Sequence, residues 1–497
     1  MLVAVFMAAT SFCQQSKFKI TYSHSPIAEW AKSPLFVDDT SMWVNASYAL
    51  NAGGYGVLML KIGMSGNILD HKECEKTNFS YLGFWAGTLF KIDSNYYTGC
   101  EIQYPDPTPA SPGDMYAFPA LIKYNLSGDT VWTRYLELDT SRLYRINSSR
   151  PTQDKGILLC GSKSTSIPGT HDFLLIKLDT AGNLLWLKTY GALNVNERAS
   201  TVEELPNGKI LLSGVKVNAS LTAANPWVLI LDDTGKIEWQ HTYTRPALKG
   251  GGGYTKAAKT GGFFLQGMVD TLINAGDNPS CPYISRMESN GSFRWLKIFN
   301  NKWFTQIWDF YELDNGDVVF CGDKIDSANN TEYGYIAKID SFGNLKWWRT
   351  FFEKPTGFHY LSCIRPAPDG GYVAVGSAVG VNTNSQDAWI IKTDSMGCVI
   401  ANCFVGIDDI ENLKAGLKVY PNPATNEVHV SVSTGLLGEG TVIAVYDMSG
   451  RRMVRIVPDG SRQKATINTK EWASGMYVIS VQRANGDMTT AKITIVK

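Results

Sequence analysis

A glycine that recurs in the same kind of tight turn constrains this sequence more than any other feature. Residues 175–186, 229–239 and 336–347 each read as an alternating strand, an Asp-x-x-Gly turn and a second alternating strand. Such a turn needs a residue at positive φ, which glycine adopts without strain. The glycine returns every 52 to 62 residues, at Gly66, Gly128, Gly182, Gly235, Gly291, Gly343 and Gly397. The chain therefore contains seven copies of one unit.

A second hairpin precedes this one within the unit. Residues 205–214, 313–322 and 368–376 each place an Asn-Gly or Asp-Gly turn between two strand-like runs. Two hairpins give four short antiparallel strands per unit. Seven four-stranded units predict an all-β fold, a seven-bladed β-propeller over residues 14–403.

A tryptophan follows the turn glycine by four residues in five of the units. An indole in this position can bury ~150–250 Å² between neighbouring blades. One copy per blade is better explained by packing than by ligand contact. We interpret these five residues as a structural repeat: Trp132, Trp186, Trp239, Trp295 and Trp347.

The last unit lacks a full fourth strand, and the N-terminal segment imitates one. Residues 18–22 have the pattern of residues 186–190, which form a fourth strand in another unit. We expect the segment 17–23 to pair into the last blade and close the ring. Closure removes the exposed sheet edge that an open array would leave.

The N-terminus has the features of an export signal. An apolar run over residues 2–9 is followed by Ser11 and Cys13, which fit the small-residue positions of a signal-peptidase site. We assign residues 1–13 to a signal peptide. Lipid attachment to Cys13 is the alternative, and the bulky Phe12 before it disfavours that alternative. No later segment has the ~20 unbroken apolar residues of a membrane span.

Charge and cysteine usage exclude several classes of function. Lys plus Arg (46) equals Asp plus Glu (46), so no field of one sign attracts the chain to nucleic acid or an anionic membrane. No Cys-x-x-Cys pair with partner histidines indicates a zinc site. Cys398 and Cys403 could close a short disulfide loop in an oxidising compartment. Cys160 and Cys321 lie at matching repeat positions on apolar strands, where we expect them to be buried.

A different pattern begins after a polar, acidic linker at residues 404–416. Over residues 417–497, alternating strands are separated by Gly and Pro turns. This pattern predicts a small immunoglobulin-like β-sandwich as a separate domain.

Four motifs in this C-terminal segment resemble the type A sorting domain of type IX secretion, a system of Gram-negative bacteria. They are a Tyr-Pro-Asn-Pro segment, a Tyr-Asp-x-x-Gly strand and turn, a Gly-x-Tyr strand, and a final strand that ends in lysine. A generic adhesion module of immunoglobulin-like fold is the alternative. The residues that carry the resemblance are Tyr420, Pro421, Asn422, Pro423, Tyr446, Gly450, Gly475, Tyr477 and Lys497.

The resemblance implies a route and partners. A Sec signal would take the chain to the periplasm, and the folded tag would guide it across the outer membrane. Its partners would be the type IX secretion machinery and a surface sortase that cleaves the linker. The expected location is extracellular or at the cell surface. The repeats also resemble those of large cargo proteins of this system, which concerns architecture and not activity.

The sequence contains no catalytic motif that we can identify. A nucleophile elbow, a His-Glu-x-x-His helix and a phosphate loop are all missing. The turn aspartates, such as Asp179, lack the further carboxylates of a calcium loop, so we interpret them as turn caps. The histidines do not share a metal-ligand spacing. We expect no catalytic residue, no metal and no cofactor.

The strands of each unit alternate in direction, so the long connections gather on one face of the ring. Rigid scaffolds often present function on such variable loops. Aromatic residues there could stack on sugar rings, and sealing of blade junctions is the alternative for each of them. The candidates are Tyr104, Tyr116, His171, Trp303, Phe304, Phe358, His359 and Tyr360.

We therefore expect a secreted or cell-surface module for binding or adhesion, with a glycan or protein ligand. The alternative is an extracellular hydrolase or lyase with its site at the central channel. Two carboxylates within about 10 Å of each other at that channel would favour the enzyme. A mouth lined by aromatics and amides would favour binding.

Overall fold

The computed structural model of this chain contains strands and no helix among the residues that it describes. The chain divides into two compact units, Met1–Ala401 and Asn402–Lys497. The structure describes residues 17–497 except for 26, 52, 77–78, 83–87, 106–114, 137, 139–142, 166–169, 218–223, 244–251, 271–279, 300–303, 327–330, 355–356, 380–384, 400–416, 433–441, 448–450, 458–463 and 483–487. The predicted signal peptide and linker lie outside these residues.

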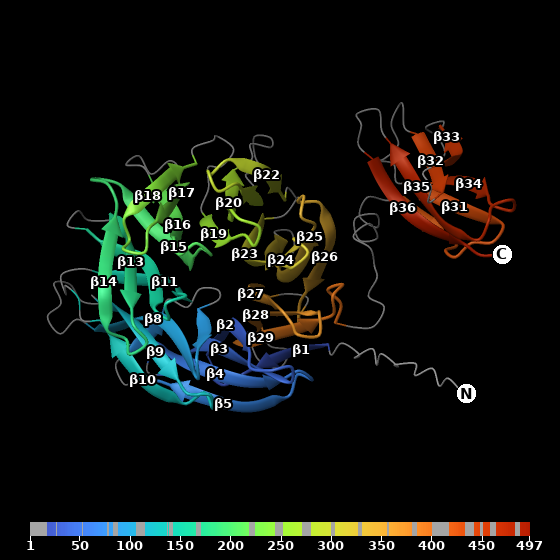
Figure 1. Cartoon of the computed structure of the whole chain (residues 1–497). Coiled ribbons are helices and arrows are strands. Elements are labelled where there is room, and N and C mark those ends of the chain that lie inside the picture. The colour runs from blue at the N-terminus through green and yellow to red at the C-terminus, as the bar shows by residue number, and fades with distance from the viewer. Residues whose placement is uncertain are drawn as a thin grey trace, which may run out of the picture. The chain divides into compact units, whose positions relative to one another are not determined.

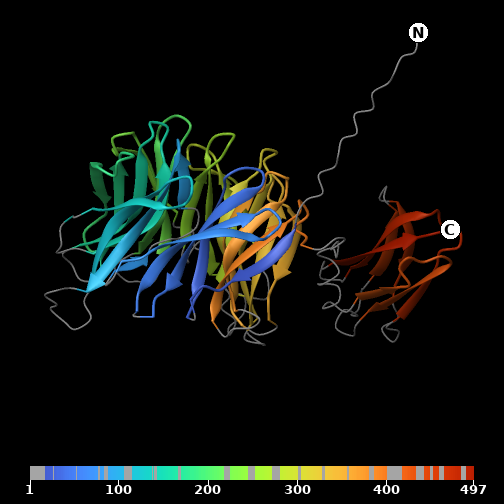
Figure 2. The same ribbon diagram turned by 90° about the horizontal axis from the view of Figure 1, so that it is seen from below.

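Antiparallel sheets make up the first unit (Figures 1 and 2), and the described strands form seven of them. In chain order, these contain β2 (Glu29–Phe36), β3 (Ser41–Ala49), β4 (Tyr55–Gly63) and β5 (Ile68–Cys74); β6 (Ser80–Leu82), β7 (Leu89–Ile92), β8 (Asn95–Pro105), β9 (Met115–Tyr124) and β10 (Thr130–Tyr135); β11 (Tyr144–Pro151), β12 (Ile157–Ser164), β13 (His171–Leu178) and β14 (Leu184–Tyr190); β15 (Asn196–Glu204), β16 (Ile210–Val217), β17 (Ala224–Leu231) and β18 (Ile237–Thr242); β19 (Gly252–Ala257), β20 (Phe263–Asp270), β21 (Ser280–Met287) and β22 (Phe293–Ile298); β23 (Phe304–Glu312), β24 (Val318–Asp326), β25 (Thr331–Ile339) and β26 (Leu345–Phe351); and β27 (His359–Pro366), β28 (Tyr372–Val379) and β29 (Gln386–Thr393) with β1 (Phe18–Tyr22).

The sheets contact one another in sequence around a common centre (Figure 1). Strand β12 packs on β15, β16 on β19 and β24 on β27. The last sheet contacts the first, because β28 packs on β2. The innermost strand of a sheet is the first in chain order, as in β11, β15 and β19. This arrangement of antiparallel sheets is a β-propeller.

The N-terminal strand completes the last sheet. Strand β1 pairs antiparallel with β29, with Phe18 opposite Lys392 and Tyr22 opposite Ala388. Just before the strand, Lys17 Nζ lies 2.6 Å from the carboxylate of Asp394. The two ends of the propeller segment are therefore joined by a backbone ladder and an ion pair.

An aromatic ring of one sheet covers the turn glycine of the next sheet. A Cβ atom added to Gly291 would lie 2.4 Å from Trp239, and one added to Gly397 would lie 2.6 Å from Trp347. Both glycines have positive φ, 81° and 77°, so only glycine suits the turn and the close approach. The same ring-on-glycine contact joins Trp132 to Gly182, Trp186 to Gly235 and Trp295 to Gly343.

Two other aromatic residues take this role where the repeated tryptophan is missing. Trp43 of β3 would lie 2.5 Å from a Cβ atom on Gly128, and Phe18 of β1 would lie 2.8 Å from one on Gly66. Phe18 aligns with the repeated tryptophans in the sequence. Trp43 does not, because it lies on a different strand of its unit. In every case the ring belongs to the preceding sheet.

The repeated turns and two of the cysteines behave as the sequence predicts. Asp179 Oδ1 accepts hydrogen bonds from the backbone N–H groups of Ala181 (2.9 Å) and Asn183 (2.8 Å), so it caps its own turn. Cys160 and Cys321 are buried. Cys398 is disulfide-bonded, and its expected partner Cys403 lies outside the described residues.

The second unit contains two further sheets. One consists of β30 (Leu417–Tyr420), β31 (Glu427–Val432) and β34 (Lys464–Asn468), and the other of β33 (Arg452–Ile456), β32 (Val442–Asp447), β35 (Gly475–Gln482) and β36 (Met488–Ile495). A single apolar cluster takes side chains from both sheets, including Val430, Val445 and Ile479. The two sheets therefore face each other across one core.

Candidate functional site

A cavity of about 1120 Å³ lies where the innermost strands of the propeller meet. Its walls come from β2, β11, β15, β19, β23 and β27, which are far apart in the sequence. Ligand sites are commonly concave and ~300–1,000 Å³ in volume. The cavity is therefore large enough for a ligand of several rings.

A β-bulge in each of these six strands shapes the wall. The register between the innermost strand and its neighbour skips one residue in every case. A bulge bends its strand and re-aims a side chain. One skipped residue is Gly253, and the other five line the cavity: Lys32, Asn147, Ser200, Trp308 and Ser362.

Strand direction gives the cavity two different ends. The innermost strands start on the side of the long connections, so residues before each bulge face that side. We call this end the mouth, lined by Trp30, Arg145, Arg198 and Tyr360. Residues after the bulge face the tight turns. We call that end the base, lined by Arg150, Lys256 and Asp309.

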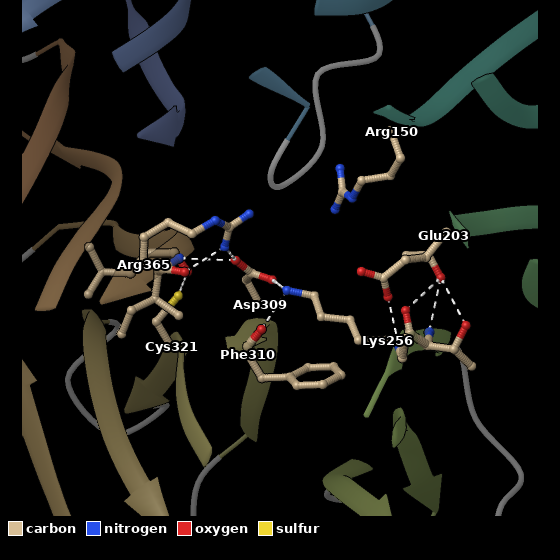
Figure 3. A network of polar contacts seen from close by, with 12 residues as sticks. Arg150, Glu203, Lys256, Asp309, Phe310, Cys321 and Arg365 are labelled. Atoms are coloured by element: carbon tan, nitrogen blue, oxygen red, sulfur yellow. Dashed lines mark hydrogen bonds and ion pairs between the residues drawn. The ribbon is translucent and has the colours of Figure 1, made fainter. Parts of the chain in front are cut away.

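A closed network of charges occupies the base (Figure 3). One carboxylate oxygen of Asp309 accepts a hydrogen bond from Lys256 Nζ at 2.6 Å. The other oxygen accepts from Arg365 at 2.6 Å and from the Ile364 N–H at 3.1 Å. Lys256 also donates to the carbonyl of Phe310. Three consecutive sheets are thus joined through one carboxylate.

Electrostatics keep this network ionised. Burial alone would raise the pKa of Asp309, but the charges of Lys256 and Arg365 outweigh burial and hold that pKa well below its usual range. Burial lowers the pKa of Lys256. Burial and then the charge of Arg365 lower the pKa of Arg150, whose guanidinium points into the space between Asp309 and Glu203 in Figure 3. The base is a compensated structural cluster.

Two carboxyl groups behave differently at the mouth. Asp323 on β24 accepts a hydrogen bond from the indole N–H of Trp308, and burial raises the pKa of Asp323 to about 7. Glu332 lies on the neighbouring strand β25, opposite Ile325. Burial, and then the charge of Asp323, raises the pKa of Glu332 to about 8. At neutral pH this pair therefore holds protons that ordinary carboxyl groups have lost.

Cations outnumber ionised carboxylates at the mouth. Arg145 pairs with Glu101 at 2.5 Å, and burial nevertheless raises the pKa of that glutamate. Burial lowers the pKa of Lys32 to about 8. Burial, and then the charge of Arg198, lowers the pKa of His171, which favours the neutral imidazole. The mouth consequently presents a positive surplus beside the exposed ring of Phe358 and the half-buried rings of Trp30 and Tyr360.

The cavity gathers three of the predicted ligand-face residues: His171, Phe358 and Tyr360. Phe358 is exposed. The expectation for His359 is wrong, because its side chain is fully buried. Its ring lies 5.8 Å from that of Trp389 and its Nδ1 lies 2.8 Å from the Glu332 carbonyl oxygen. His359 and Tyr360 are neighbours on β27, so their side chains point to opposite faces.

The long connections are shorter than the sequence predicts. Tyr104 and Tyr116 pair with each other at the ends of β8 and β9 instead of lying in a loop. Phe304 is the first residue of β23 and pairs with Ile325. Aromatic residues favour strands, which explains the extension. The side chains of Tyr104, Tyr116 and Phe304, and Trp303 as a whole, lie outside the described residues.

Reasoning from the sequence missed the charged residues of the mouth. Arg145 and Arg198 stand at one repeat position of the innermost strands, and Trp30 and Tyr360 share that position. An alignment of the first strands of the units would have revealed this ring. Asp323 and Glu332 lie on strands whose pairing brings them together, and neither has a local motif.

The predicted sorting residues tie one end of the second unit together. The Asn422 side chain donates to the Lys492 carbonyl (3.0 Å) and accepts from the Thr494 N–H (2.9 Å). This pins the Pro421–Pro423 turn to β36. Lys497 Nζ donates to the carbonyls of Thr425 (2.7 Å) and Thr469 (2.9 Å). The terminal lysine thus holds two turns of the same end.

The remaining sorting residues divide into buried and exposed ones. Tyr477 is buried and donates to the Ala473 carbonyl at 3.0 Å. Tyr446 is half-buried and pairs with Val478 between β32 and β35. Tyr420 is exposed, with its ring 5.4 Å from His429. Gly475 begins β35. Gly450 lies outside the described residues.

One group of possible metal ligands occurs in the part of the chain that the structure describes. It consists of His24, His71 and Glu73, whose ligand atoms lie within 4.8 Å of one another. The sequence gives no hint of it, because His24 is distant from the other two. The described residues also contain no helix that is long and apolar enough to cross a membrane.

The solved structures that match this chain do so at low identity and low TM-score. PorZ, described as an essential bacterial surface component of the type IX secretion system of Porphyromonas gingivalis, has a TM-score of 0.35 at 9% identity, over 92% of this chain and 69% of PorZ. The β-propeller domain of the Trilobed protease from Pyrococcus furiosus has 0.41 at 9%, over 78% and 100%. An alpha-L-arabinanase of Penicillium chrysogenum has 0.39 at 12%, over 60% and 90%.

Comparison of sequences gives one family. No curated protein matches the chain. The model of the secretion system C-terminal sorting domain matches residues 418–497, which confirms the resemblance carried by the four C-terminal motifs. Such a domain implies export to the cell surface. Residues 418–497 are therefore a C-terminal sorting domain of the type IX secretion system, behind an all-β propeller.

Proposed function

We propose that this protein is an exported binding module whose seven-bladed propeller, residues 14–403, takes an anionic glycan or an acidic protein segment at the mouth of its central cavity. The immunoglobulin-like domain at residues 417–497 delivers it, after Sec export, to the type IX secretion machinery and a surface sortase. Adhesion or capture at the cell surface follows from that location.

The charge of the cavity wall is the observation that carries the proposal. Away from the compensated base, three cationic side chains line the cavity against two carboxyl groups, Glu101 and Glu332, and burial raises the pKa of both. A concave site lined by positive charges attracts anions. Trp30, Phe358 and Tyr360 add flat surfaces suited to sugar rings. These three cations are Lys32, Arg145 and Arg198.

A glycan array with the full mature chain tests the proposal. We expect binding to glycans that carry carboxylate or sulfate groups, weakened by salt because the charges attract each other through water. Arg198→Gln should weaken this binding at least tenfold. The matched control is Lys155→Gln, which removes an exposed cation paired with Asp93 on the tight-turn side. Equal binding of neutral glycans, or equal loss with both variants, would contradict the proposal.

A hydrolase or lyase is the second candidate, and the Asp323–Glu332 pair favours it. Carboxyl groups with raised pKa beside a cavity are common general acids. The same array ligands can be incubated with the protein and analysed for shorter products. Cleavage that Glu332→Gln abolishes, with ligand binding retained, would assign the enzyme. Intact ligand after long incubation leaves the binding module.

A further inference from the structure

A second group of side chains capable of binding a ligand lies where the closing strand leads into the first sheet. His24 follows β1, while His71 and Glu73 lie two residues apart on the edge strand β5 and so share one face. The Nε2 atom of His24 lies 3.2 Å from Glu73 Oε1, and that of His71 lies 3.8 Å from the same oxygen. One carboxylate oxygen therefore stands between two imidazoles.

The backbone around His24 is held firmly. Its N–H donates to the carboxylate of the buried Glu29 at 3.0 Å. The next residue, Ser25, donates its hydroxyl to the Ala49 carbonyl at 2.8 Å. These bonds fix the connection between β1 and β2 against the end of β3. The fold therefore fixes the backbone position from which the His24 side chain extends.

Packing also orients the imidazole of His24. The ring stacks on Tyr22, with centroids 6.4 Å apart, and meets the ring of Tyr48 edge-on at 5.0 Å. The side chain keeps 22% of its surface exposed, against 48% for His71 and 40% for Glu73. One ligand is therefore preorganised, and the other two are free to adjust at the surface. A metal ion can reach all three from solvent.

The donor set and its spacing suit zinc. Two imidazole nitrogens and one carboxylate oxygen form a common Zn²⁺ set, with bonds of about 2.0–2.2 Å. Tetrahedral ligands at that distance lie about 3.3 Å from one another. The three ligand atoms are within 4.8 Å of one another. If the His71 and Glu73 side chains rotate so that their ligand atoms move by about 1 Å, all three ligand atoms can reach bonding distance of one zinc ion.

We propose that His24, His71 and Glu73 bind one Zn²⁺ ion, with water in the fourth position. The ion would tie the connection that follows the closing strand β1 to the outer edge of the sheet β2–β5. This goes beyond ligand binding at the central cavity and does not depend on it. Its consequence is a metal-strengthened closure of the propeller ring.

Calorimetric titration of the metal-free full mature chain with ZnCl₂ tests the site. We expect one ion per chain, and at least tenfold weaker binding in His71→Gln and in Glu73→Gln, since the loss of one of three protein ligands weakens a metal site strongly. Cobalt in place of zinc should give the visible absorption of a tetrahedral site in the wild type alone. Zinc should raise the Tm of the wild type and leave that of His71→Gln unchanged.

The control is His241→Gln, which removes an exposed histidine on the edge strand β18 of another sheet. It should keep full zinc affinity. Unchanged affinity in both His71→Gln and Glu73→Gln would overturn the site. A loss in His241→Gln as large as in His71→Gln would mean adventitious surface binding and would overturn it as well. Both ligands that are changed are exposed, so the metal-free variants should have the Tm of the metal-free wild type.

Discussion

The two ends of the central cavity contain similar residues and use them in opposite ways. At the base, Asp309 is buried, ionised and hydrogen-bonded to Lys256 and Arg365. At the mouth, burial raises the pKa of both Asp323 and Glu332, the charge of Asp323 raises that of Glu332 further, and no cation among the described residues pairs with either as at the base. Burial is shared by both ends. The presence or absence of a placed cation decides the charge.

This difference separates stability from function within one cavity. A compensated network holds sheets together, and breaking it leaves a buried charge without a partner. Two carboxyl groups that keep protons to near neutral pH beside an open cavity hold sheets together poorly and are well placed to contact a ligand. The mouth is therefore the end where substitutions should alter binding more than folding.

The largest effect should come from the base. Asp309→Ala leaves Lys256 and Arg365 buried without their carboxylate, and we expect the free energy of unfolding to fall by about 3–5 kcal/mol. Denaturant unfolding of the purified protein measures it. A loss below about 1 kcal/mol would mean that the base is not a structural cluster, and the contrast with the mouth would disappear.

A substitution of Asp323 at the mouth should raise the free energy of unfolding instead of lowering it. The pKa of Asp323 is about 7 when folded and ~3.9 when unfolded, so the folded state keeps a proton that the unfolded state loses. The stability contribution is therefore complete below about pH 4 and is lost as pH rises towards about 7.

Asp323→Asn removes this titration and can still accept the Trp308 hydrogen bond. We expect the variant to be more stable than the wild type by about 4 kcal/mol at pH 8.5, with a smaller difference at pH 4, since each of the roughly three units of pKa shift corresponds to ~1.4 kcal/mol. Unfolding curves at the two pH values measure the difference. Parallel pH profiles for both proteins would show that Asp323 ionises as an ordinary surface carboxyl.

The smallest effect on stability should come from Arg198→Gln. This residue lines the mouth, and among the residues that the structure describes it forms no ion pair like those of the base. We expect the free energy of unfolding to change by less than about 0.5 kcal/mol, although ligand binding weakens at least tenfold. A destabilisation comparable to that of Asp309→Ala would assign the mouth to folding and remove it as a binding site.

The repeating elements could be predicted from the sequence because each depends on neighbouring residues. The turn glycines, the capping Asp179 and the likeness of Phe18 to Trp186 are local patterns. The role of Trp43 could not be predicted, because it covers the turn glycine Gly128 from a different strand of its unit. A repeat reveals a role only when the role stays at one repeat position.

The cavity could not be predicted in the same way. A bulge shifts the alternation of a strand by one residue, so residues such as Lys32 and Trp308 cannot be assigned to a face by counting. The pairing of Asp323 with Glu332, and the meeting of His24 with His71, depend on how separate strands lie in space. The prediction for His359 failed for a related reason, since a connection was expected where β27 begins.

The ring-on-glycine contacts all run in one rotational sense, from Phe18 on Gly66 through to Trp347 on Gly397. Every junction between sheets is therefore head-to-tail: one sheet supplies the aromatic ring, and the next supplies the turn glycine that the ring covers. Head-to-tail contacts form either a closed cycle or an endless chain. If β1 with Phe18 left the ring, the turn at Gly66 and the edge of β29 would both become exposed. The freed β1 of one molecule could then pair with β29 and cover Gly66 of another. We therefore expect ring closure also to protect this protein from polymerising.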